Sequence, residues 1–175
     1  MRISSHALTV WLLLLVSSHA QSTLAQAGSA ALQPPYERKA APELGLKDSQ
    51  GKRADLKDYR GDVILLDFWA TWCHECQQEI PWFAEYERKY HEAGLRVVGV
   101  SLDEEGWEVV KPFIKTAAVP YRILLGNDAT ATAYGIVNMP ETFLIDRDGR
   151  IAAAYVGMVD RNNIAKNIEI LLEQK

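Results

Sequence analysis

The residues best suited to chemistry lie in one short stretch, WATWCHECQQEIP, over residues 69–81 of this 175-residue chain. It contains Cys73 and Cys76, the only cysteines of the sequence. A disulfide between residues three positions apart closes a very small loop and stabilises a fold of this size little. Such a bond is better suited to opening and closing, so the spacing predicts a redox-active pair. An inert bridge and a metal site with His74 remain alternatives, although a structural zinc site needs four ligands.

The segments on either side of the pair predict how it is positioned. Residues 62–70, DVILLDFWA, form a short apolar run typical of a strand buried on both faces. After the pair, apolar side chains recur at three- and four-residue intervals as far as Gly94, which predicts an amphipathic helix. Cys73 therefore lies at a helix N-terminus, where free N–H groups and the helix dipole favour a thiolate. We expect Cys73 to be the attacking nucleophile and Cys76, one turn further in, to be the resolving cysteine.

The rest of the chain alternates strands and helices. This order predicts an α/β fold with a central mixed sheet and helices on both faces. Asp-Gly in the DRDG turn indicates a hairpin, and Asp160 suits the N-cap of a last helix. The expected strands are 95–102, 121–126, 141–146 and 150–157, and the expected helical segments are 104–118, 128–135 and 160–175.

The N-terminal region is typical of an export signal. One arginine precedes an apolar core over residues 7–16, which is too short to cross a membrane as a helix, and small residues follow. We expect a signal peptide over residues 1–25, cleaved between residues 20 and 27; an uncleaved leader that anchors the protein is the alternative. Three prolines then indicate a linker over residues 26–40, before a single domain over residues 41–175. The net charge of −4 gives no reason to expect a nucleic-acid partner.

Three segments carry a family resemblance: DFWATWCHEC, NMPETFLID, and the closing hairpin with its helix. They resemble the thioredoxin-like fold. The opening APELGLKDSQGKRADLKDYRGDVILLDFWATWC is similar to exported, membrane-associated proteins of the ResA/TlpA type, within the AhpC/TSA-redoxin superfamily. The resemblance covers about residues 41–173, and it implies an added N-terminal β-hairpin and an insert near residues 103–118.

The resemblance implies roles for particular residues. Pro140 matches the family's cis-proline, so the Met139–Pro140 bond is expected to be cis, and these two residues with Trp72 are expected to bind the partner's peptide. Asp67 matches the buried acid of thioredoxin and Glu79 the acid of the ResA-like branch. A carboxyl group taken out of water has a raised pKa and can transfer protons near neutrality. An exposed helix acid at Glu79 and a packing role for Trp72 are the competing interpretations.

Departures from the family pattern limit what the resemblance implies. The dipeptide between the cysteines is His74-Glu75, and we expect both residues to tune the reduction potential with opposite sign. Glu141 follows Pro140 where threonine is frequent, which would alter the choice of partner.

These observations together predict an exported thiol–disulfide oxidoreductase without a bound cofactor or metal. By resemblance, it reduces protein disulfides, receives electrons from a membrane thiol transporter, and acts on apocytochrome c or on copper-site proteins. A copper-binding metallochaperone using Cys73, Cys76 and His74 is the alternative from a different class. A thiol peroxidase is disfavoured because Ala70 stands three residues before Cys73, where such enzymes have threonine.

Overall fold

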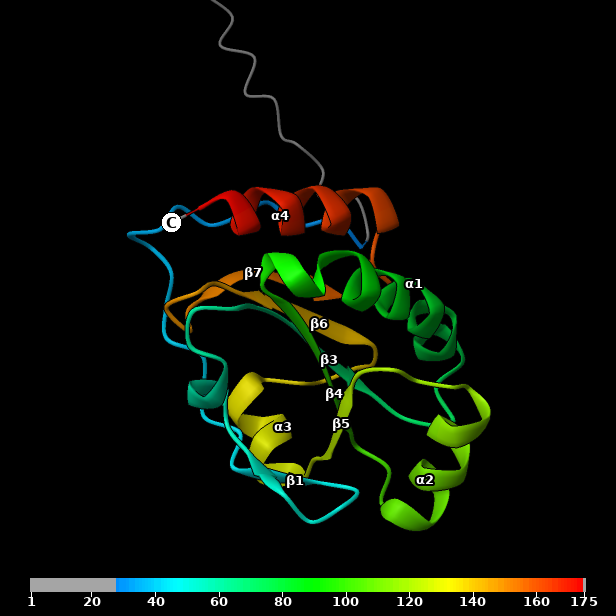
Figure 1. The fold of residues 1–175 in the computed structure, drawn as a ribbon. Helices are drawn as coiled ribbons and strands as arrows, with labels where there is room; N and C mark the ends of the chain where they lie inside the picture. The colour runs from blue at the N-terminus through cyan, green and yellow to red at the C-terminus, as the bar shows by residue number, and fades with distance from the viewer. Residues whose placement is uncertain (1–27, 175) are drawn as a thin grey trace, which may run out of the picture.

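The computed structural model describes residues 28–174, so the expected signal peptide lies outside the described residues. Within this range, seven strands form one mixed sheet in the order β2-β1-β5-β4-β3-β6-β7 (Figure 1). Strands β3, β4 and β5 run parallel, whereas the remaining neighbours pair antiparallel. This confirms the predicted fold class, including the added hairpin β1–β2.

The elements match the expected segments closely. The strands are β1 (Leu46–Asp48), β2 (Arg53–Ala54), β3 (Val63–Trp69), β4 (Leu95–Ser101), β5 (Arg122–Leu125), β6 (Glu141–Ile145) and β7 (Ile151–Val156). The α-helices are α1 (His74–Tyr90), α2 (Trp107–Thr116), α3 (Asp128–Tyr134) and α4 (Arg161–Glu173), with short 3-10 turns at Leu56–Tyr59 (η1) and His91–Ala93 (η2). Helix α2 occupies the predicted insert.

Helices cover both faces of the sheet, as Figure 1 shows for α1 and α4 on one side and α3 on the other. Alternate side chains of β3 enter two separate cores because successive strand residues point to opposite faces. Leu65 and Trp69 pack in the core under α1 and α4, whereas Leu66 and Phe68 pack in the core under α3. Every residue of β3 is buried, as its continuous apolar sequence predicts.

Helix α1 begins directly after this central strand. Its buried stripe contains Cys76, Ile80 and Phe83, which confirms the predicted amphipathic pattern. Gly94 ends the region in the left-handed conformation, with φ of 95°, which glycine adopts without the penalty that a Cβ atom brings. The helix is therefore anchored along its length, with its first turn at the end of β3.

The structure corrects the expectation of a free linker over residues 26–40, as far as that segment is described. Residues 28–41, here called the strap, run beside β7 and α4 instead. The Gln33 N–H donates to the Ala152 carbonyl oxygen at 2.8 Å, and the Ile151 N–H donates to the Lys39 carbonyl oxygen at 2.8 Å. Arg38 is buried and forms an ion pair with Asp146 at 3.1 Å. Prolines restrict helix formation here, but they do not prevent an extended segment from packing on a fold.

Among the helices that the structure describes, none combines the length and apolar character needed to span a bilayer.

Candidate active site

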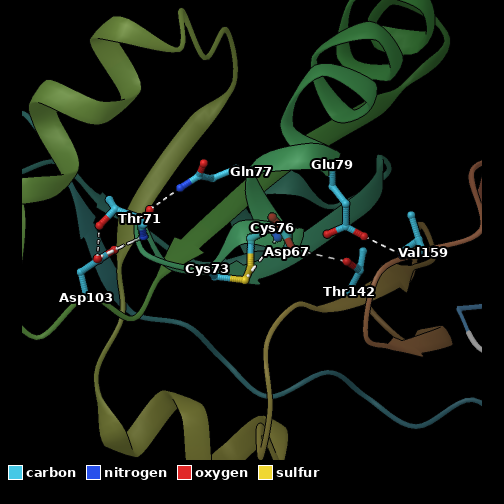
Figure 2. The surroundings of a disulfide bond; sticks show 9 residues. All are labelled: Asp67, Thr71, Cys73, Cys76, Gln77, Glu79, Asp103, Thr142 and Val159. Carbon is cyan, nitrogen blue, oxygen red and sulfur yellow. Dashed lines mark hydrogen bonds between the residues drawn. A yellow bond between two sulfur atoms is a disulfide. The ribbon is translucent and has the colours of Figure 1, made fainter.

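Cys73 and Cys76 are joined in a disulfide at the start of α1, with their Cα atoms 5.3 Å apart (Figure 2). Cys73 is 6% exposed and Cys76 is 0% exposed. Cys73 is thus the more exposed of the two, and its role as the attacking cysteine stays a prediction.

Cys73 occupies the N-cap position of α1. Its Sγ accepts a hydrogen bond from the Cys76 N–H at 3.2 Å, and its carbonyl oxygen accepts one from the Gln77 N–H at 3.1 Å. Unpaired N–H groups at a helix start carry partial positive charge. In the reduced protein, the same N–H stabilises a thiolate on Cys73 more than a thiol.

Two buried carboxyl groups lie near the disulfide, Asp67 on β3 and Glu79 on α1 (Figure 2). Burial raises the pKa of Asp67 to about 7, and a long hydrogen bond from the Thr142 hydroxyl, at 3.4 Å, acts in the opposite direction. Burial also raises the pKa of Glu79 to about 8; the neighbouring Asp67 adds to this shift, and the Val159 N–H, which donates to Oε1 at 2.6 Å, opposes it.

These two acids are suited to hold one proton between them near neutral pH. Each disfavours ionisation of the other, so they titrate as a coupled pair. The second oxygen of Glu79, Oε2, is buried and has no hydrogen-bond partner among residues 28–174. An unpaired buried oxygen is costly for a carboxylate, which fits a protonated Glu79 at neutral pH. The interpretation of Glu79 as an exposed helix acid is therefore wrong.

The predicted docking residues lie in the turn before Cys73 and in the segment before β6. The Met139–Pro140 peptide bond is cis, as expected, and precedes β6. Trp72 is 66% exposed, so it does not pack in the core. Glu141 pairs in register with Phe68 of β3 and is buried, and this burial raises its pKa. A buried acid thus stands directly after the cis-proline.

His74 and Glu75 are exposed in the first turn of α1. Their effect on the reduction potential stays a prediction. Among residues 28–174, no three histidine, cysteine, aspartate or glutamate side chains are grouped so that they would hold a metal ion.

A hydrogen-bond network that sequence reasoning missed holds the turn before Cys73. The Thr71 N–H donates to both carboxylate oxygens of Asp103, at 3.1 and 3.0 Å, and the Thr71 hydroxyl donates to Oδ1 at 2.5 Å (Figure 2). The Ser101 hydroxyl donates to Oδ2 at 2.8 Å, and Gln77 Nε2 donates to the Thr71 carbonyl oxygen at 2.6 Å. The signal that would have found Asp103 is its place just after β4, because parallel strands such as β3 and β4 end at one edge.

The fold and the cysteine pair define the class of this protein: it has a thioredoxin-like architecture, with a Cys-x-x-Cys disulfide at the start of the helix that follows a central strand. The model of the AhpC/TSA family matches residues 38–154. The chain belongs to the AhpC/TSA family.

Relatives within this class agree with the assignment. Thiol-disulfide oxidoreductase ResA of Bacillus thuringiensis subsp. konkukian (strain 97-27) is 36% identical over 115 residues, which cover 65% of each chain. Thiol-disulfide oxidoreductase ResA of Bacillus thuringiensis (strain Al Hakam) is 33% identical over 150 residues, covering 85% of this chain and 86% of the relative. The crystal structure of a thiol:disulfide interchange protein DsbE from Chlorobium tepidum, described as putative, superposes with a TM-score of 0.74 at 31% identity, covering 81% of this chain and 99% of that one.

The chain thus spans 65% of the length of the first of these relatives.

Proposed function

We propose that this protein is an exported thiol–disulfide oxidoreductase that reduces disulfides in other proteins through Cys73 and Cys76. The observation that carries the proposal is the arrangement of the pair: an outer sulfur at a helix N-cap, a fully buried sulfur one turn below it, and two acids with raised pKa values near both. This arrangement suits reversible disulfide exchange better than a permanent bridge.

The exchange proceeds in two substitutions. In the reduced protein, the Cys73 thiolate attacks one sulfur of the partner's disulfide; that S–S bond breaks, the partner's other sulfur leaves as a thiolate, and Cys73 is joined to the partner. The Cys76 thiolate then attacks Cys73 Sγ and releases the partner's second thiolate. Two electrons have passed to the partner, and the Cys73–Cys76 disulfide seen here is the oxidised product.

Asp67 and Glu79 are proposed to move the proton of Cys76. Cys76 is fully buried, so water does not reach its thiol readily. A base with a pKa near the working pH is the most effective acceptor, and the pKa values of about 7 and about 8 meet this condition. The acid pair takes the proton as Cys76 attacks and returns it in the reverse direction.

Trp72, Met139 and Pro140 are proposed to bind the partner's extended peptide. In support of this, Trp72 directly precedes Cys73 and has an exposed ring, and Pro140 directly precedes β6, which pairs with the central strand β3. His74 and Glu75, exposed beside the disulfide, are proposed to set its reduction potential.

Export and direction belong to the same proposal. The leader over residues 1–25 and its cleavage between residues 20 and 27 would deliver the protein to an oxidising compartment, where a reductant needs an electron source. A membrane thiol transporter as donor, and apocytochrome c or copper-site proteins as acceptors, follow from the resemblance to proteins of the ResA/TlpA type.

Trapping tests the assigned roles. Cys76→Ser leaves the mixed disulfide without its resolving thiol, so a covalent adduct with the partner should accumulate in cells and separate on a non-reducing gel. The matched control, Cys73→Ser, should form no adduct. If neither variant captures a protein, the assigned roles of the two cysteines are wrong.

The direction and the copper alternative need separate measurements. The reduction potential of the pair, measured against a glutathione or dithiothreitol buffer, should lie close to the thioredoxin value of about −270 mV; a value near −120 mV would reverse the direction. Metal analysis of reduced protein decides the alternative. Stoichiometric copper held by Cys73, Cys76 and His74, without disulfide reductase activity, would identify a metallochaperone.

A further inference from the structure

The turn that precedes the nucleophile is held by side chains from other elements. The Cys73 N–H donates to the Ala70 carbonyl oxygen at 3.1 Å, which closes a tight turn with Thr71 in its middle. Asp103, in the connection from β4 to α2, accepts from the N–H and the hydroxyl of Thr71. Gln77, on α1, donates to the carbonyl oxygen of the same residue. Thr71 is thus bound on its donor side and on its acceptor side.

We propose that Asp103 and Gln77 are positioning residues, which hold Thr71 from two sides and thereby keep the Cys73 sulfur at the N-cap of α1. The inference rests on the proposed function in that it names residues that prepare the nucleophile for exchange. Neither residue is proposed to contact the partner or to transfer a proton.

The burial of Asp103 makes its carboxylate dependent on the hydrogen bonds from Thr71. Asp103 is 5% exposed, and no lysine, arginine or histidine of residues 28–174 forms an ion pair with it. A buried carboxylate without a cation depends on hydrogen bonds to offset its desolvation, and here the donors are Thr71 and Ser101. Moving Thr71 away would leave the charge undersolvated, so the position of the turn is tied to the end of β4.

The end of β4 is itself fixed against β3. The Leu102 N–H donates to the Trp69 carbonyl oxygen at 2.9 Å, which extends the pairing of the two strands beyond Ser101. Asp103 follows directly and reaches the turn after β3. The hydrogen bonds of Asp103 and Gln77 to Thr71 are here called the clamp. Through Asp103, the clamp fixes the two residues before Cys73 relative to the rigid parallel sheet. A shift of about 1 Å in the position of a reacting group lowers the rate by on the order of 10²-fold, so we expect the clamp to affect the rate at which Cys73 reacts.

Alkylation of Cys73 by iodoacetamide tests the proposal without any partner protein. The reduced full chain is alkylated between about pH 4 and about pH 10, and modification of Cys73 is followed by mass spectrometry. For Asp103→Ala, the rate at neutral pH should fall about tenfold and the midpoint of the pH profile should rise by about one unit, because the thiolate loses its place at the N-cap. Asp103→Asn should restore nearly wild-type behaviour, since its amide accepts from the Thr71 N–H and donates to the hydroxyls.

A purely electrostatic role of Asp103 predicts the opposite result. If the carboxylate acted only by repelling the thiolate, both variants would lower the midpoint and speed alkylation. That outcome, or a wild-type profile for Asp103→Ala, would overturn the proposal. Asp55→Ala is the control for general destabilisation: Asp55 is also a buried carboxylate, but it accepts hydrogen bonds from the Leu44 and Leu56 N–H groups rather than from the turn. It should leave the profile unchanged.

A second pair of variants keeps the test valid if Asp103→Ala does not fold. Gln77 and Gln78 are neighbouring exposed residues of α1, and Gln77 is the one whose side chain bonds to Thr71. Gln77→Ala should slow alkylation of Cys73 about threefold, in line with a net hydrogen bond of about 0.5–1.5 kcal/mol, whereas Gln78→Ala should match the wild type. Equal rates for the two variants would refute the role of Gln77.

Failure of the proposed function gives a different pattern. A wild-type protein without reductase activity contradicts the function, whereas the ratios of alkylation rates between variants test the clamp in either case.

Discussion

Replacing Asp67 by asparagine should make the protein more stable at alkaline pH. The structure gives the magnitude. Burial raises the pKa of Asp67 from its ordinary value of 3.8 to about 7, a difference of about three units. Each unit corresponds to about 1.4 kcal/mol, so ionising this carboxyl inside the fold costs about 4 kcal/mol of the free energy of unfolding. Asparagine has nearly the same shape, keeps an oxygen for Thr142, and has no charge to bury.

The sign follows from proton binding. Below about pH 4, the carboxyl is protonated in both the folded and the unfolded chain, and its shift costs nothing. Between about pH 4 and about pH 7, the unfolded chain releases the proton while the folded chain retains it, so stability falls as pH rises. Glu79 adds a loss of the same sign that extends to about pH 8. The full penalty is present above that value.

Urea denaturation of the oxidised protein at pH 5, 7 and 9 measures this effect. The wild type should lose several kcal/mol over the range, and Asp67→Asn should lose less, so the two curves should diverge toward pH 9. Because Asp67 contributes to the raised pKa of Glu79, Glu79→Gln combined with Asp67→Asn should gain less than the sum of the single changes. Parallel curves for wild type and Asp67→Asn would refute the assignment of a buried, protonated Asp67.

Two further predictions concern kinetics and packing. Glu79→Gln should slow the resolving step by on the order of 10²-fold and remove the inflection near pH 8 from its pH–rate profile, whereas Glu108→Gln, an exposed helix acid, should change neither; an unmoved profile would exclude Glu79 from proton transfer. Gly99→Ala should lower the free energy of unfolding by about 1–3 kcal/mol, because its Cβ would lie 2.6 Å from Ile123 Cδ1 and 3.0 Å from Trp69 Nε1 in a packed core; an unchanged urea midpoint would show that the core yields there.

Much of the fold could be predicted because local patterns and tertiary burial agree. The apolar run before the cysteines is β3, and the periodic segment after them is α1, so Cys73 was placed correctly at a helix start. Asp67 stood out as an acid inside an apolar strand, and it is buried. In both cases, the signal lies within a few residues of the feature that it predicts.

Features that depend on distant partners were not predictable in this way. The contact between Thr71 and Asp103 spans 32 positions, and nothing in the spacing of the two residues marks it. The burial of Glu141 depends on its register against Phe68. Prolines near the start indicated a linker, but Arg38 finds its ion-pair partner Asp146 at a separation of 108 residues. Contacts between residues far apart in the chain decide the surroundings of these positions, and the pattern of a single sequence does not reveal which residues make those contacts.

The strap is expected to prevent association between copies of this protein, because it covers an edge of the sheet. Strand β7 is the last of the sheet, and an uncovered outer strand offers its amide and carbonyl groups to any other chain in extended conformation. The backbone groups of Gln33 and Lys39, in the strap, already pair with part of this edge of the sheet. A recombinant chain that begins at Pro42 would leave the backbone groups of β7 uncovered and Asp146 without its ion-pair partner Arg38. It should therefore aggregate by edge-to-edge association, whereas a chain that begins at Gly28 should remain dispersed.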